Sequence, residues 1–104
     1  MPSNIQRKLA AVMFTDIVGF TERMSIDENK ALNLLDEKIT ITKPLIKKYN
    51  GIYIKEIGDG TLSFFDSATE AIDCAAKIQS ILRNRVDLRI GLHLGEVILK
   101  DGDI

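Results

Sequence analysis

The chain has 104 residues, with 14 Lys or Arg, 15 Asp or Glu and a formal net charge of −1. That length predicts one domain over residues 1–104, and 45% apolar and 28% charged residues indicate an ordinary globular protein rather than a disordered or fibrous one. The mildly acidic balance disfavours a nucleic-acid partner, because such binders usually carry a basic excess.

The first predicted element is a strand over residues 8–16, an apolar and β-branched stretch that is too short for a stable helix. Side-chain alternation places Val12, Phe14 and Asp16 on one face and the residues between them on the other. We expect a loop centred on Gly19 to follow this strand.

A long helix is predicted to begin near Ser25, which forms a capping-box pattern with Glu28, and to end at Asn50-Gly51. Pro44 lies inside this span and predicts a kink or a looser turn at residues 40–43. The apolar stripe of this helix comprises Ala31, Leu34, Leu35, Ile39, Ile46 and Tyr49.

Two strands are predicted over residues 52–57 and 61–65, since the intervening Gly58-Asp59-Gly60 is a strong hairpin signal. A second helix begins near Ser67, which forms another capping-box pattern with Glu70, and a final strand covers about 87–99 before a turn at 100–104. The residues of the second helix expected to face inward are Ala68, Ala71, Ile72, Ala75, Ile78, Ile81 and Leu82.

This order of elements predicts an α+β fold of the ferredoxin-like βαββαβ type, an antiparallel sheet with both helices on one face. The other face of such a sheet is available to a partner or a substrate. No membrane segment is predicted, because the apolar run at residues 9–14 is far shorter than the roughly 20 residues that span a bilayer. The single Cys74 cannot form an internal disulfide, so we expect a reducing, cytoplasmic location.

Residues 14–21, Phe-Thr-Asp-Ile-Val-Gly-Phe-Thr, have two interpretations. Asp16 stands at the end of a buried strand, before a loop that contains Gly19. Backbone N–H groups in such a loop can hold phosphate, and the carboxylate can hold a hard cation. The alternative is a solvated strand end followed by an ordinary turn.

Asp59 has a similar ambiguity, because a tight turn also requires Asp-Gly. The predicted topology favours a functional role, since the strand over 8–16 would neighbour the hairpin and Asp16 could meet Asp59 at one edge of the sheet. Two adjacent carboxylates are unfavourable unless a divalent metal neutralises them. Paired metals held in this way serve phosphoryl or nucleotidyl transfer.

Lys55 is expected to share a strand face with Tyr53 and Ile57. A single lysine on a strand is usually solvated, but a lysine on an apolar sheet face needs a partner, because burying an unpaired ammonium is costly. Both interpretations remain open for Lys55.

His93, the only histidine, is interpreted as a core or interface imidazole rather than a catalytic base, since no Ser or Cys nucleophile is placed near it. Phe64 and Phe65 are likewise expected in the core or an interface. The sequence has no Walker A pattern, no dinucleotide-binding fingerprint and no Cys/His spacing typical of a zinc site.

Three ordered segments resemble the signatures of class III adenylate/guanylate cyclase catalytic domains, in the bacterial style. They are residues 8–21 around Phe14-Thr15-Asp16, the stretch Lys55-Glu56-Ile57-Gly58-Asp59-Gly60, and residues 89–97. The resemblance runs from about residue 7 to the end of the chain.

The resemblance implies that Asp16 and Asp59 are the catalytic, metal-binding aspartates and that the backbone carbonyl of Ile17 also binds metal. Two Mg²⁺ or Mn²⁺ ions per site are implied as cofactors. Lys55 matches the lysine that recognises adenine, which favours ATP over GTP. The residues that match the loop contacting the triphosphate are Val18, Gly19, Phe20 and Thr21.

The implied reaction is attack of the ribose 3′-oxygen of ATP on the α-phosphate, giving cyclic AMP and pyrophosphate, with one metal activating the 3′-oxygen and the other binding the triphosphate. In this family the site lies between two subunits in head-to-tail contact, which implies a homodimer with Asp16 and Asp59 from one subunit and Lys55 from the other. Family members continue past Ile104 to an Asn and an Arg that act on ribose and the transition state. The chain is therefore expected to be the N-terminal part of the catalytic domain, self-associating and inactive alone.

Three alternatives remain. A guanylate cyclase has the same fold, and a diguanylate cyclase also carries an acidic hairpin, although the Gly-Gly-acidic-acidic-Phe pattern is missing here. A non-catalytic nucleotide-binding or dimerisation module on the same fold is the third.

Overall fold

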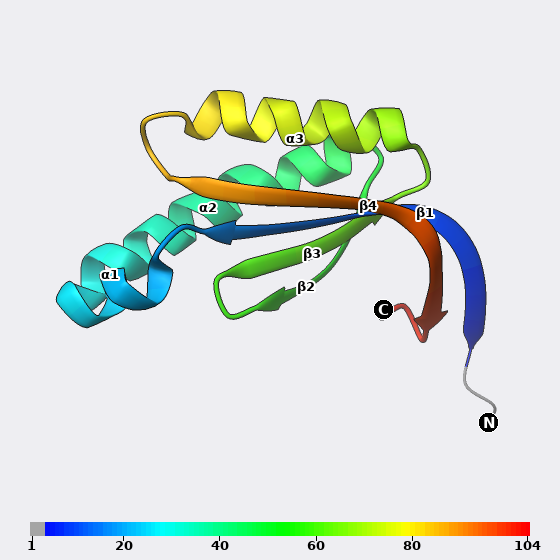
Figure 1. The fold of residues 1–104 in the computed structure, drawn as a ribbon, viewed down its shortest axis with the longest axis horizontal. Helices are drawn as coiled ribbons and strands as arrows, with labels where there is room; N and C mark the ends of the chain where they lie inside the picture. Colours follow the sequence, from blue (N-terminus) through cyan, green and yellow to red (C-terminus); the bar gives the residue numbers. More distant parts are fainter. Residues whose placement is uncertain (1–3) are drawn as a thin grey trace.

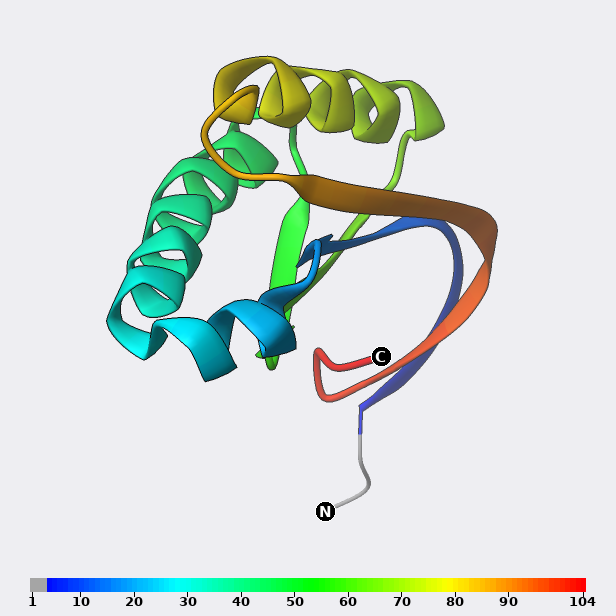
Figure 2. The same cartoon turned by 60° about the vertical axis from the view of Figure 1, so that its left-hand side comes forward.

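Four antiparallel strands form one sheet in the order β2-β3-β1-β4 (Figure 1). The structure is a computed structural model that describes residues 4–104. The strands are β1 (Ile5–Ile17), β2 (Ile52–Ile57), β3 (Gly60–Phe65) and β4 (Leu88–Lys100), and the helices are α1 (Phe20–Ile26), α2 (Glu28–Lys48) and α3 (Ala68–Leu82). Helices α2 and α3 cover one face of the sheet (Figures 1 and 2), which confirms the expected ferredoxin-like α+β arrangement.

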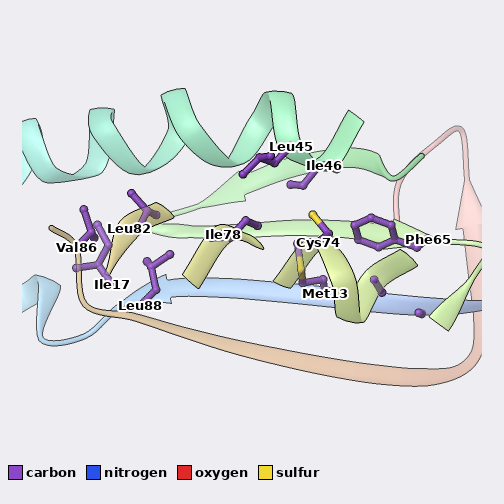
Figure 3. Packing of buried hydrophobic residues seen from close by; sticks show 12 residues of the cluster. Met13, Ile17, Leu45, Ile46, Phe65, Cys74, Ile78, Leu82, Val86 and Leu88 are labelled. Carbon is purple, nitrogen blue, oxygen red and sulfur yellow. The ribbon is translucent and has the colours of Figure 1, made fainter. Parts of the chain in front are cut away.

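Alternation along β1 separates two apolar clusters. Ala11 and Met13 belong to the main core between the sheet and the helices, whereas Ala10 belongs to a smaller cluster with Phe64. Phe65 lies in the main core, so the expected burial of both phenylalanines is confirmed. Figure 3 shows the main core, which includes Met13, Ile17, Leu45, Ile46, Phe65, Cys74, Ile78, Leu82, Val86 and Leu88.

The segment between β1 and α2 is not simply a loop. Gly19 adopts the left-handed conformation, φ 67°, and α1 follows it directly. The predicted cap of the long helix is also wrong: the Asp27 carboxylate accepts the Lys30 amide at 3.1 Å, while the Ser25 hydroxyl donates to a carbonyl within α1. Both side chains are good caps, and the additional helix places Asp27 at the start of α2.

Helix α2 continues without interruption through Pro44 and across residues 40–43, where a kink or looser turn was expected. Its inward stripe is also less apolar than the sequence pattern predicts. Lys38 and Thr42 are fully buried on it, together with Ala31 and Ile46. A lysine with no exposed surface requires hydrogen-bond partners within the protein.

The predicted cap of α3 is confirmed, because the Ser67 hydroxyl accepts the Glu70 amide at 3.2 Å. Ile72 was expected to face inward, but its side chain is 57% exposed. Cys74 takes the inward place, because the buried line of the helix runs through residues 71, 74, 78 and 82. Burial raises the pKa of the Cys74 thiol to about 11.

A β-bulge in β2 changes which side chains share a face. The pairing register with β3 shifts between Tyr53 and Lys55, leaving Ile54 as the extra residue. Lys55 therefore lies on the sheet face opposite to Tyr53, and the prediction that they share a face is wrong. Glu56 takes the place beside Tyr53, whose hydroxyl donates to the Glu56 carboxylate.

His93 is exposed on β4, so its placement in the core is wrong, whereas an interface role stays a prediction. The physical reason is the strand order, since β4 is an edge strand. The expected turn after β4 is confirmed by the backbone hydrogen bonds that Lys100 and Asp103 exchange, at 2.8 and 3.0 Å. Within residues 4–104, the helices are all too short or too polar to cross a membrane.

Candidate active site

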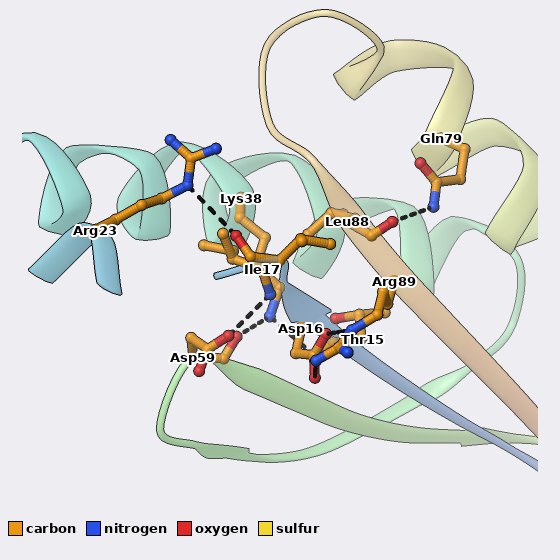
Figure 4. Close-up of polar contacts among 10 residues, drawn as sticks. Thr15, Asp16, Ile17, Arg23, Lys38, Asp59, Gln79, Leu88 and Arg89 are labelled. Atoms are coloured by element: carbon orange, nitrogen blue, oxygen red, sulfur yellow. Dashed lines mark hydrogen bonds and ion pairs between the residues drawn. The ribbon is translucent and has the colours of Figure 1, made fainter. Parts of the chain in front are cut away.

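The end of β1, the start of α1 and the β2–β3 hairpin surround one pocket of about 350 Å³. Asp16 and Asp59 both line this pocket, although they are far apart in the sequence (Figure 4). The full lining comprises Asp16, Ile17, Gly19, Phe20, Thr21, Glu22, Asp59 and Arg89. The sheet topology thus brings together the two carboxylates and most of the glycine-containing loop.

Two of the predicted site residues lie outside the pocket lining. Val18 lies in the segment between β1 and α1, with its amide donating to the Asp87 carbonyl at 2.9 Å and its carbonyl accepting from Arg23 Nε at 3.4 Å. Lys55 lies apart from Asp16 and Asp59, and its ammonium pairs with the Asp103 carboxylate at 2.8 Å. Within a single chain, Lys55 is therefore not part of this pocket.

The Asp59 carboxylate is oriented by the backbone of β1. Its Oδ2 atom accepts the Ile17 amide at 2.8 Å, across the gap between the hairpin and the strand end. The turn that presents Asp59 uses the positive φ of Gly58, 61°, which glycine adopts without strain. The hydrogen bond from the Ile17 amide directs the Asp59 carboxylate toward the residue that follows Asp16.

The Asp16 carboxylate is held by Arg89 in a two-pronged ion pair. Arg89 lies directly across from Asp16 in the β1–β4 register, and its Nε and Nη2 donate to Oδ1 and Oδ2 at 2.9 and 3.0 Å. These hydrogen bonds raise the pKa of Arg89, so the guanidinium stays charged. The local sequence does not predict the pairing of Arg89 with Asp16, because that pairing depends on the register between β1 and β4.

Lys38 is a second cation beside the carboxylates, and sequence reasoning missed it. Its Nζ atom donates to the carbonyls of Thr15 and Asp59 at 3.3 and 2.5 Å (Figure 4). It also donates to the Thr61 hydroxyl at 2.9 Å. The Thr61 hydroxyl in turn donates to the Glu56 carboxylate at 2.9 Å. The signal that could have identified Lys38 is its position as a polar residue on the buried stripe of α2.

Desolvation lowers the pKa of Lys38, while the negative charges of Glu56, Asp59 and Asp16 act in the opposite direction. Because all three N–H donors of the ammonium have oxygen acceptors, the charged form is well accommodated. The site therefore contains two carboxylates and two cations, of which Arg89 is exposed and Lys38 is buried.

The donor set at the pocket consists of oxygen atoms. The two carboxylates suit Mg²⁺ or Mn²⁺, which prefer oxygen ligands and commonly keep waters or phosphate oxygens as the remaining ligands. Within the described residues, no group of three or more His, Cys, Asp or Glu side chains could hold a metal ion. A cation here would depend on further ligands, as magnesium bound with a nucleotide does.

Comparison with known proteins gives consistent matches. Residues 5–101 match the family model described as the adenylate and guanylate cyclase catalytic domain. The chain is 34% identical over 111 residues to a protein named putative adenylate cyclase 3 from Rhizobium meliloti, covering 97% of this chain and 19% of that protein. It is 32% identical over 104 residues to an adenylate cyclase from Mycobacterium bovis, covering 86% of this chain and 24% of that protein.

Among solved structures, a crystal structure described as an adenylate/guanylate cyclase/hydrolase from Silicibacter pomeroyi is similar, with a TM-score of 0.86 and 32% sequence identity. The match covers 96% of this chain and 64% of that one. The chain spans less than a quarter of the length of the two curated relatives.

The Arg89–Asp16 ion pair predicts competition between Arg89 and a cation. In the absence of nucleotide, Arg89→Gln should tighten Mn²⁺ binding by about two- to fivefold, since the exposed ion pair is weak but must loosen before a metal reaches both oxygens of Asp16. Titration calorimetry with Mn²⁺ alone measures the change. Arg85→Gln, which removes an arginine paired instead with Glu37, is the control. Equal affinities of the Arg89→Gln variant and the unmodified chain would contradict the competition.

Proposed function

We propose that this chain, which belongs to the adenylate and guanylate cyclase catalytic domain family, binds a divalent metal with a nucleoside triphosphate at Asp16 and Asp59. The observation that carries the proposal is the convergence of both carboxylates on one pocket, which Ile17 and Gly19 also line. The activity that we propose for the complete site is formation of a 3′,5′-cyclic nucleotide and pyrophosphate.

Asp16, Asp59 and the carbonyl of Ile17 would hold the metal. When bound, Mg²⁺ or Mn²⁺ would lower the pKa of the attacking 3′-hydroxyl and neutralise charge on the triphosphate. The chain's own contribution is to hold the two carboxylates at one place, with Asp59 oriented by the Ile17 amide. Arg89, once displaced from Asp16, lies close enough to the pocket to donate hydrogen bonds to phosphate oxygens.

We infer that the nucleotide is ATP. Support comes from the resemblance of Lys55 to an adenine-recognising lysine and from relatives named adenylate cyclases. The position of Lys55, outside the pocket of its own chain, fits a site shared by two subunits, in which Lys55 serves the partner's pocket. An open sheet face with partly exposed apolar residues, including Phe14, Ile52 and Ile57, is compatible with such a contact.

The residues that the proposal names, Asp16, Asp59 and Lys55, are assigned roles in holding the metal and the nucleotide. Nucleotide binding is therefore the property that tests the proposal.

Asp16→Asn and Asp59→Asn should each weaken binding of Mn²⁺ with a non-hydrolysable ATP analogue by more than about tenfold, because each removes one of two anionic ligands. Asp59→Asn keeps a side-chain oxygen that can accept the Ile17 amide, so the hairpin geometry is retained. Calorimetry gives the affinities, and Asp73→Asn on the exposed face of α3 is the matched control. Unchanged metal-dependent binding in either of the first two variants would rule out the two-carboxylate site.

Lys55→Glu should lower the ratio of the affinity for the ATP analogue to that for the GTP analogue. Lysine only donates hydrogen bonds, whereas the N1–H and N2–H₂ groups of guanine require an acceptor such as glutamate. Lys77→Glu makes the same charge change at an exposed position of α3 and should leave the ratio unchanged. If the ratio is the same in the Lys55→Glu and Lys77→Glu variants, Lys55 does not select the base.

A further inference from the structure

Lys38 is completely buried on α2, yet its ammonium lies among polar atoms directly behind the candidate site. Its three donors meet three acceptors, the carbonyls of Thr15 and Asp59 and the hydroxyl of Thr61. Since an ammonium has three N–H groups, each of them has a partner. Figure 4 shows Lys38 reaching from α2 toward the end of β1 and the hairpin.

Two of these acceptors belong to the segments that carry the carboxylates. Thr15 directly precedes Asp16 in β1, and Asp59 is itself the second carboxylate residue. The Asp59 residue is thus held from two sides, with its carbonyl bound to Lys38 at 2.5 Å and its carboxylate oxygen bound to the Ile17 amide at 2.8 Å. One side chain of α2 therefore ties the hairpin tip to the end of β1.

Stability alone does not account for a charge at this position. Replacing buried charges with apolar side chains of similar size is often neutral or stabilising, because desolvation of the ions is costly. The other buried positions on the stripe of α2 are uncharged, namely Ala31, Thr42, Leu45 and Ile46, so the helix packs without charges elsewhere. The ammonium instead serves two backbone carbonyls that no apolar side chain could bind.

We propose that Lys38 is a positioning residue that fixes the Asp59 hairpin against the Asp16 end of β1 before any metal binds. The proposal rests on the proposed function only in taking these two aspartates as the metal ligands. Lys38 does not touch the metal or the nucleotide; it acts through the backbone of the residues that do.

An electrostatic role predicts the opposite sign. If Lys38 affected the site only as a nearby positive charge, its removal would relieve repulsion and tighten the binding of a cation. If Lys38 positions the aspartates, its removal would loosen the hairpin and weaken binding. The Thr61 hydroxyl accepts a hydrogen bond from Lys38 and donates one to Glu56, so it lies in the same buried network. Its bonds do not include the carbonyls of Thr15 and Asp59.

The test compares Lys38→Met with Thr61→Val as a matched control in the 104-residue chain. Without metal, amide hydrogen exchange at Ile17 reports the bond to Asp59, and urea unfolding reports global stability. We expect exchange at Ile17 to accelerate at least about tenfold in Lys38→Met after normalisation to global stability, since hydrogen bonds to charged groups are strong. Thr61→Val should destabilise the chain but leave the normalised exchange at Ile17 within about threefold.

Binding of Mn²⁺ alone is the second measurement. Lys38→Met should weaken it at least about tenfold, and Thr61→Val by less than about threefold. If Lys38→Met does not fold, Lys38→Gln, which keeps an amide donor for one carbonyl, replaces it and should show a smaller loss in both measurements.

The proposal is overturned if normalised exchange at Ile17 is unchanged, if Mn²⁺ binds more tightly, or if both variants lose affinity in proportion to their loss of stability. If the unmodified chain binds no Mn²⁺ that depends on Asp16, the proposed function fails while the metal-free exchange measurement still decides the role of Lys38.

Discussion

The central strand β1 is hydrogen-bonded on both sides, and the candidate site depends on where each pairing ends. Pairing with β3 extends to Thr15 opposite Thr61, next to the turn of the hairpin. Pairing with β4 continues to Ile17, which places Arg89 directly across from Asp16. Asp16 therefore lies just past the last β3 pair and next to the tip that carries Asp59. A one-residue slip of β1 would turn Asp16 to the helix side and remove both relationships.

The two cations at this point differ in their freedom to move. Arg89 is largely exposed, with 69% of its side chain accessible, and its pair with Asp16 can open when a metal arrives. Lys38 is enclosed by α2, β1 and the hairpin, and its donors are committed to fixed backbone and hydroxyl oxygens. In our proposals, the metal displaces Arg89 from Asp16 during binding, whereas Lys38 keeps the Asp59 hairpin fixed against the end of β1.

Much of the fold and the meeting of the two aspartates could be predicted from the sequence, because both depend on local patterns. Alternation in β1, the Asp-Gly turn and the order of elements together predict that Asp16 and Asp59 meet. The missed features depend on contacts distant in the sequence. Lys38 finds its acceptors at residues 15, 59 and 61, and the bulge at Ile54 has no glycine or proline to signal it. That bulge decides the side of the sheet on which Lys55 lies.

Anomalous X-ray scattering from Mn²⁺ would locate a metal ion at the site that we propose for Asp16 and Asp59. Crystals of the chain grown with Mn²⁺ and a non-hydrolysable ATP analogue should give an anomalous peak within about 2.2 Å of oxygen atoms from both carboxylates. Arg89 should have released at least one oxygen of Asp16. A Mn²⁺ peak away from either carboxylate, with the Arg89–Asp16 pair intact, would rule out a metal site shared by Asp16 and Asp59.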